Sequence, residues 1–97
     1  MKLSESHLIQ LAAVVDAGSV SKGAVMLGVA QPSVSRSLVQ LEERIGQPLF
    51  VRGRRPLQAT PLGIQLATHG RRILAESRRA SEVVQSLLRG SRGLVRV

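Results

Sequence analysis

The sequence predicts a mainly α-helical protein, in which three short helices and a two-stranded wing precede one long helix. Three observations support this fold class. Apolar residues recur at spacings of three and four along most of the chain, the period of an amphipathic helix. Near the middle, two short apolar runs flank a basic turn, as in a hairpin. Between Pro61 and Arg89 no proline interrupts the chain, so this segment can form one continuous helix.

The first helix should begin after Ser4, whose hydroxyl can cap the open amides of the first turn. Leu3 can pack against Leu8 across that cap. The helix should end near Gly18, since glycine tolerates the left-handed conformation common after a last turn.

The second helix should span residues 20–27, capped by Ser19 and stopped by Gly28. Ala24 and Leu27 should face inward. Gly23 lies inside this helix and costs about 1 kcal/mol of helix propensity against alanine. Close packing against a neighbouring helix is the one role that the sequence suggests for Gly23.

The third helix should span residues 31–45, because Pro32 suits a first turn and Gly46 suits an end. Its apolar residues form a single buried stripe. They are Val34, Leu38, Leu41 and Ile45. Arg36 lies almost opposite this stripe and should face the solvent.

The hairpin should pair the runs 48–51 and 56–59 around a basic tip. The long helix should then start at Thr60 and Pro61, a cap followed by a first-turn proline, and end near Arg89. Its 29 residues would extend about 43 Å at ~1.5 Å each. Such a helix is too long to be covered by a sixty-residue body.

A narrow seam of the coiled-coil type runs along the long helix and predicts a homodimer. It consists of Leu66, Gly70, Ile73, Ser77, Ala80, Val84 and Leu87. Residues 90–93 suggest a hinge, and residues 94–97 suggest the start of a strand that has no sheet. We therefore predict three parts: a compact domain of helices and wing over residues 1–60, a dimerisation helix over residues 61–89, and a hinge with the start of an effector domain over residues 90–97. The chain would then be a fragment of a longer protein whose effector domain is missing.

Composition limits the function. The 97 residues suit one small domain, and a hydrophobic content of 43% excludes a wholly disordered chain. Without cysteine, and with only His7 and His69, both interpreted as surface residues, we predict no disulfide, metal site or cofactor. There is no set of catalytic residues, and the adjacent Glu42 and Glu43 more plausibly support their helix. We do not expect an enzyme.

The charge balance points to a polyanionic partner. Fourteen Lys and Arg against six Asp and Glu give a formal net charge of +8, which favours nucleic acid first and an anionic membrane second. A membrane surface is disfavoured because Phe50 is the only aromatic anchor. Neither a signal peptide nor an apolar run of the ~20 residues that a span needs is present. We expect a soluble, cytoplasmic protein.

Two short helices joined by a tight turn, the second with a polar outer face, predict a helix-turn-helix. Together with the basic hairpin this is a winged helix-turn-helix, whose second helix would enter a DNA major groove. The candidate contacts on that helix are Gln31, Pro32, Ser33, Ser35, Arg36 and Gln40. Whether Arg36 contacts a base or a phosphate is left open.

Two further groups are candidates for contact with the DNA backbone. Arg52, Arg54 and Arg55 at the wing tip could enter the minor groove or hold phosphates. Ser19, Ser21 and Lys22 at the start of the second helix could bind phosphate, although capping explains Ser19 equally well. The arginines of the long helix are interpreted mainly as its solvated face. They are Arg71, Arg72, Arg78 and Arg79.

Practically the whole chain, from Leu3 to Val97, resembles the N-terminal part of LysR-type transcriptional regulators. The resemblance rests on AGSVSKGA, VAQPSVSRSLVQLEERIGQPLF and RRPLQATPLG in this order. Gln31, Pro32, Ser35 and Arg36 match the usual contact region of the family's recognition helix, and Arg54 and Arg55 match its wing. The chain departs from the family at Leu11 and Val20, where aromatic residues are frequent, and at Gly23, where alanine is usual.

The resemblance implies a sequence-specific double-stranded-DNA-binding transcriptional regulator that binds an interrupted inverted repeat as an antiparallel homodimer. It also implies a C-terminal domain that binds a small-molecule inducer, tetramers assembled through that domain, and an association with the bacterial nucleoid. Two other hypotheses are a winged-helix regulator of another family, such as the molybdate-responsive type, and a protein-interaction module whose basic wing is incidental.

Overall fold

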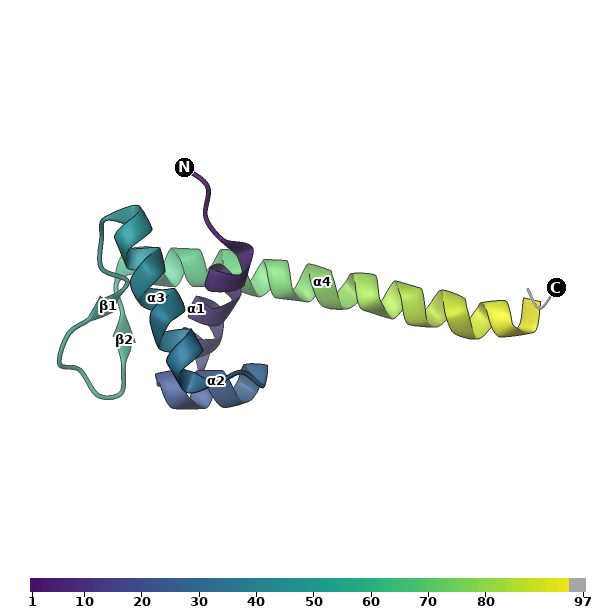
Figure 1. The fold of residues 1–97 in the computed structure, drawn as a ribbon, viewed down its shortest axis with the longest axis horizontal. Helices are drawn as coiled ribbons and strands as arrows, with labels where there is room; N and C mark the ends of the chain where they lie inside the picture. The colour runs from purple at the N-terminus through teal and green to yellow at the C-terminus, as the bar shows by residue number, and fades with distance from the viewer. Residues whose placement is uncertain (95–97) are drawn as a thin grey trace.

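The structure, a computed structural model, describes residues 1–94. The elements follow in the order α1 (Glu5–Ala17), α2 (Val20–Leu27), α3 (Gln31–Ile45), β1 (Phe50–Val51), β2 (Gln58–Ala59) and α4 (Pro61–Leu94). The first three helices, the hairpin and the start of α4 form a body at one end, and the rest of α4 projects from it as a rod (Figure 1). The molecule therefore measures 60 × 28 × 20 Å, and its fold class is the predicted one.

The ends of the short helices are fixed by the predicted caps. The Ser4 hydroxyl accepts a hydrogen bond from the His7 amide (3.3 Å), and the Ser19 hydroxyl accepts one from the Lys22 amide (3.1 Å). Gly18 and Gly28 follow α1 and α2 with φ of 80° and 70°. Because these capping signals are local, the sequence predicted both helices correctly.

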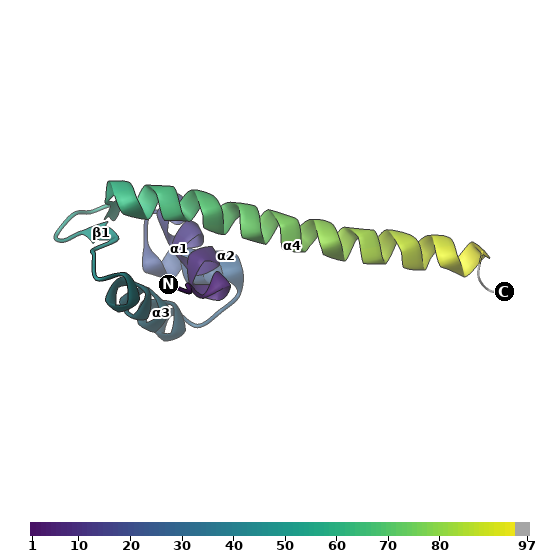
Figure 2. The same cartoon turned by 90° about the horizontal axis from the view of Figure 1, so that it is seen from above.

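The core lies around α1, which packs between α4 on one side and α3 on the other (Figure 2). The largest fully buried side chains are aliphatic, in a chain whose only aromatic residue is Phe50. They are Leu11, Val14, Val34, Leu41 and Leu49. No single helix within residues 1–94 has the length and apolarity to cross a bilayer, and only α1 and α2 together, bent by 120°, have both.

Glycine allows two close helix contacts in this core. A Cβ added to Gly23 in α2 would lie 2.9 Å from the Val14 Cα of α1, so glycine is required there by close packing. A Cβ added to Gly70 in α4 would collide with the carbonyl oxygen of Leu8. Gly70 was predicted to face a partner helix. The structure corrects this, because α1 of the same protomer covers it.

The C-terminal end of α4 also differs from the prediction. Residues 90–93 were expected to form a hinge, yet the helix continues through them to Leu94. The two glycines lower helix propensity but keep their amide donors, so the hydrogen-bond ladder is not broken as proline would break it. Residues 94–97 were expected to begin a strand. Leu94 is instead the last residue of α4, and residues 95–97 lie outside the described residues.

The wing is an antiparallel hairpin with strands of two residues each, shorter than the predicted runs. Phe50 pairs with Ala59, and Val51 with Gln58. The base of the hairpin is closed by the Leu49 amide, which donates to Glu42 Oε2 (2.7 Å), and by the Thr60 amide, which donates to the Leu49 carbonyl (3.0 Å). Glu42 thus joins α3 to the wing.

Candidate nucleic-acid interface

The helix α3 has one buried face and one exposed face. Val34, Ser37, Leu38 and Leu41 are buried against the body. Of the predicted contact residues, Ser33 is half-buried and the others are exposed. These exposed residues are Gln31, Pro32, Ser35, Arg36 and Gln40. The structure therefore brings the predicted set together on the outer surface of one rigid helix.

Arg36 lies in the middle of this exposed face. Its Nη2 atom donates to the Ser33 hydroxyl at 3.4 Å, a long contact within the same helix. Within residues 1–94 it joins no ion pair. A guanidinium that is charged, exposed and without a carboxylate partner can still make bidentate contacts with a phosphate or with a guanine edge.

The wing tip carries the three predicted arginines, all exposed. The turn passes through Gly53, whose φ of 75° lies in the left-handed region that glycine adopts most easily. The strand leading back from the tip is held to the body, because the Leu57 amide donates to the Gly18 carbonyl at 3.1 Å. This bond fixes the wing beside the start of α2.

As a result, two groups predicted separately meet around one hollow. Lys22 and the Ser19 cap lie on its α2 side, and Arg54 and Arg55 lie on its wing side. Ser21 is exposed in the first turn of α2, where it and Lys22 line a second shallow hollow. A positively charged hollow at a helix N-terminus suits a phosphate group. Arg52 instead borders a depression on the C-terminal half of α3.

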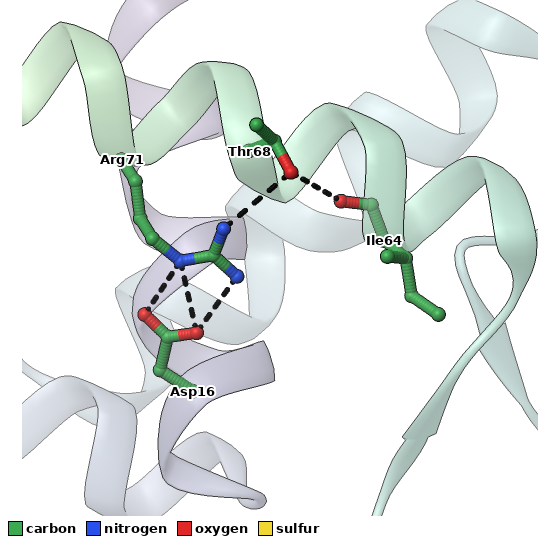
Figure 3. Close-up of polar contacts among 4 residues, drawn as sticks. All are labelled: Asp16, Ile64, Thr68 and Arg71. Carbon is green, nitrogen blue, oxygen red and sulfur yellow. Dashed lines mark hydrogen bonds and ion pairs between the residues drawn. The ribbon is translucent and has the colours of Figure 1, made fainter.

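Arg71 has a structural role that the sequence analysis missed. Figure 3 shows its guanidinium against the carboxylate of Asp16 in α1, with Nη2 and Oδ1 separated by 2.8 Å and Nε and Oδ2 by 3.0 Å. The hydrogen bond to Asp16, together with its charge, raises the pKa of Arg71 against the opposing effect of burial. Arg71 therefore links α4 to α1 while its side chain stays 44% exposed, so its predicted exposure is confirmed and only its partner Asp16 was missed. Sequence spacing gives no signal for a pair 55 residues apart.

The predicted dimerisation seam divides into two parts. Leu66 and Ile73 are half-buried against the core, and Gly70 is covered by α1. The other four positions are exposed on the projecting part of α4. They are Ser77, Ala80, Val84 and Leu87. Of the predicted seam, only these four exposed positions can pack against a partner helix without displacing a contact within the protomer.

A tightly turned helix pair, an exposed polar second helix and a basic hairpin together define a winged helix-turn-helix. Residues 6–64 match the family model described as bacterial regulatory helix-turn-helix protein, lysR family. The chain belongs to this family, which is one of regulators and not of enzymes, and the family prediction is confirmed.

The chain matches curated relatives over only part of their length. The small neutral protease regulatory protein of Streptomyces coelicolor is 42% identical over 76 residues, which is 78% of this chain and 23% of that protein. The nitrogen assimilation regulatory protein nac of Klebsiella aerogenes is 34% identical over 84 residues, 87% of this chain and 28% of that protein. The chain thus spans about a quarter of the length of these relatives.

Solved structures show the same fold. The chain is similar to the BenM DNA-binding domain crystallised with catB site 1 DNA, with 32% identity, a TM-score of 0.73 and coverage of 91% of this chain and 95% of that one. Full-length LysG from Corynebacterium glutamicum superposes with a TM-score of 0.74 at 23% identity, over 90% of this chain and 30% of that chain. The latter likeness concerns the fold alone.

Proposed function

We propose that this chain is the DNA-binding module of a bacterial transcription regulator, and that it binds duplex DNA sequence-specifically. In this proposal α3 lies in a major groove, and the wing contacts the adjacent minor groove or the backbone. The single observation that carries the proposal is the exposed face of α3, which presents Arg36 among polar residues, in a body whose wing and start of α2 form a further cationic hollow. The DNA complex of the BenM domain supports it by similarity.

We further propose that two copies bind an inverted-repeat operator as a homodimer, in the bacterial cytoplasm and on the nucleoid. The support is the exposed apolar side chains on the projecting part of α4, Val84 and Leu87 among them. Paired rods would hold two recognition helices at a fixed distance, which sets the spacing of the half-sites. An inducer-binding domain and a tetramer remain predictions from the family resemblance for the whole protein.

Selection of bound duplexes from a random pool tests this function most directly. We expect recovery of a two-fold symmetric site, whose half-site spacing reports the distance between recognition helices. Recovery of no preferred sequence, with binding to protein partners that survives high salt and loss of Arg36, would favour the protein-interaction module instead.

The variant Arg36→Ala tests the recognition helix. If Arg36 pairs with a base, the substitution should cost about 1–3 kcal/mol on the selected site and much less on random duplex. An equal loss on both duplexes would assign Arg36 to phosphate. Arg89→Ala serves as the control, because it removes the same charge from an exposed position on the projecting part of α4 and should change neither affinity.

The salt dependence of binding tests the cationic hollow. Each phosphate contact that is lost should lower the slope of log K against log salt by about 0.9. We therefore expect Arg54→Ala and Lys22→Ala to flatten the slope while the preferred sequence stays the same. An unchanged slope in both variants would exclude this hollow from the DNA interface.

A further inference from the structure

Val39 is an apolar side chain in the middle of a polar surface. It lies on the exposed face of α3, one turn beyond Ser35 and Arg36, and is 52% exposed. Together with Gln40 and Glu43, these residues border one shallow depression on the outer surface of the helix. Val39 therefore lies beside Arg36 and Gln40 on the surface that we propose enters the major groove, towards its C-terminal end.

The fold gives no structural reason for valine at this position. The apolar face of α3 points the other way, with Val34, Leu38 and Leu41 buried in the core. A β-branched residue on an exposed helix surface is also a poorer helix former than glutamine, lysine or arginine. An exposed valine here thus reduces helix propensity slightly and contributes nothing to the core.

Only one group in the major groove is apolar, the C5-methyl group of thymine. Resting on the proposed function, we propose that Val39 packs against this methyl group and so specifies an A·T pair in each half-site. The side chain is suited to the contact, because β-branching holds χ1 of a helical valine in one rotamer and little freedom is lost on binding. Val39 is then a specificity-determining residue beside the polar contacts of Arg36 and Gln40.

The expected effect is modest and measurable. Burying one methyl group is worth about 0.8 kcal/mol, which corresponds to roughly a fourfold change in affinity for each half-site. Replacing thymine by deoxyuridine removes this methyl group and leaves every hydrogen-bonding atom of the base in place. The substitution thus isolates the contact from direct hydrogen-bond readout.

The experiment uses the duplex recovered by selection and exchanges its thymines for deoxyuridine one position at a time. We expect one position in each half-site at which the exchange weakens binding about fourfold. In Val39→Ala the thymine and deoxyuridine duplexes should bind alike, whereas Val39→Thr, which keeps one methyl group, should retain part of the difference. Val25→Ala, the same truncation at an exposed valine of α2, should retain all of it.

A second arm uses 5-methylcytosine, which carries its methyl group at the same place in the groove. With a C·G pair at the sensitive position, methylation of the cytosine should restore binding by a similar factor in the unaltered protein and not in Val39→Ala. If no thymine is sensitive, or if Val39→Ala keeps the sensitivity, this inference is overturned and the proposed function stands. Failure to bind any duplex overturns both.

Discussion

The two halves of α4 are one continuous helix with opposite surroundings. Residues 61–75 lie along the body, where Ala67 is fully buried and α1 covers Gly70. Residues 76–90 are all exposed, and the C-terminal part of α4 projects from the body (Figures 1 and 2). On this projecting half four large apolar side chains are each more than half exposed. They are Val83, Val84, Leu87 and Leu88.

Both halves carry large aliphatic residues, and they differ in what covers these side chains. On the packed half Leu66 and Ile73 pack against the core, and Gly70 lets the backbones of α4 and α1 come close. On the projecting half Val84 and Leu87 are left more than half exposed by the protomer. Helices gain most of their stability from tertiary packing. The projecting half lacks such packing within the protomer, so a partner that covers its apolar side chains would stabilise it. It therefore supplies the surface for the proposed dimer.

The largest effect should come from adding one methyl group to the packed half. Gly70→Ala places a Cβ into the Leu8 carbonyl oxygen, and a collision with backbone is not relieved by a change of rotamer. We expect a loss of at least about 3 kcal/mol in the free energy of unfolding, at the upper end of overpacking costs. Urea denaturation at fixed protein concentration measures it.

Gly90→Ala is the matched control on the projecting half. Among the described residues nothing lies within 4 Å of the Cβ that it adds, so the better helix former should raise stability, by up to about 1 kcal/mol. Equal effects at the two positions would mean that α1 and α4 are not packed as described.

A smaller effect is expected from a charge on the projecting half. Leu87→Glu should leave the fold of the body intact, because Leu87 is 65% exposed in the protomer. The dimer should lose about 2 kcal/mol, the order of burying one leucine, which raises its dissociation constant roughly thirtyfold. Sedimentation equilibrium measures this constant.

Gln85→Glu adds the same charge to an exposed position outside the predicted seam and should leave the dimer nearly unchanged. If both variants dissociate equally, the seam has been assigned to the wrong side of α4. If neither does, the projecting half is not the dimer contact.

Most of the fold could be predicted because its signals are local. The Ser4 and Ser19 caps, the glycines after each helix and the stripe of α3 act within a few residues of sequence. The same holds for the exposed face of α3, since Arg36 and Gln40 are exposed once Val34 and Leu38 are buried. Local patterns thus predicted which side of α3 is exposed, apart from Ser33, which is half-buried.

Most of what failed depended on contacts between distant segments, and the end of α4 is the exception. A seam of small and apolar residues is compatible with a partner helix or with the protomer's own α1, and spacing does not distinguish them at Gly70. The extension of α4 through Gly90 was missed because glycine weakens a helix without ending it. Lys22 and Arg54 line the same hollow because a backbone hydrogen bond between Leu57 and Gly18 holds the wing beside α2. No sequence motif predicts this hydrogen bond.

The smallest of these effects concerns the ion pairs of the two halves. Arg71 pairs with Asp16 across two helices, with side chains 44% and 40% exposed, whereas Arg79 pairs with Glu76 within the projecting half, with side chains 67% and 74% exposed. Water screens both pairs, and the second more strongly. We expect Arg71→Ala to lower the free energy of unfolding by up to about 1 kcal/mol and Arg79→Ala by no more than about 0.3 kcal/mol.

A double-mutant cycle with Asp16→Asn separates the pair from the loss of the arginine's aliphatic stem, which both single substitutions of arginine share. Most of the Arg71 effect should disappear when Asp16 has already lost its charge, because the carboxylate is the group that holds the guanidinium on α1. If the Arg71 effect is unchanged in the Asp16→Asn background, the two side chains are not coupled. The attachment of α4 would then rest on the close approach at Gly70 and on apolar packing alone.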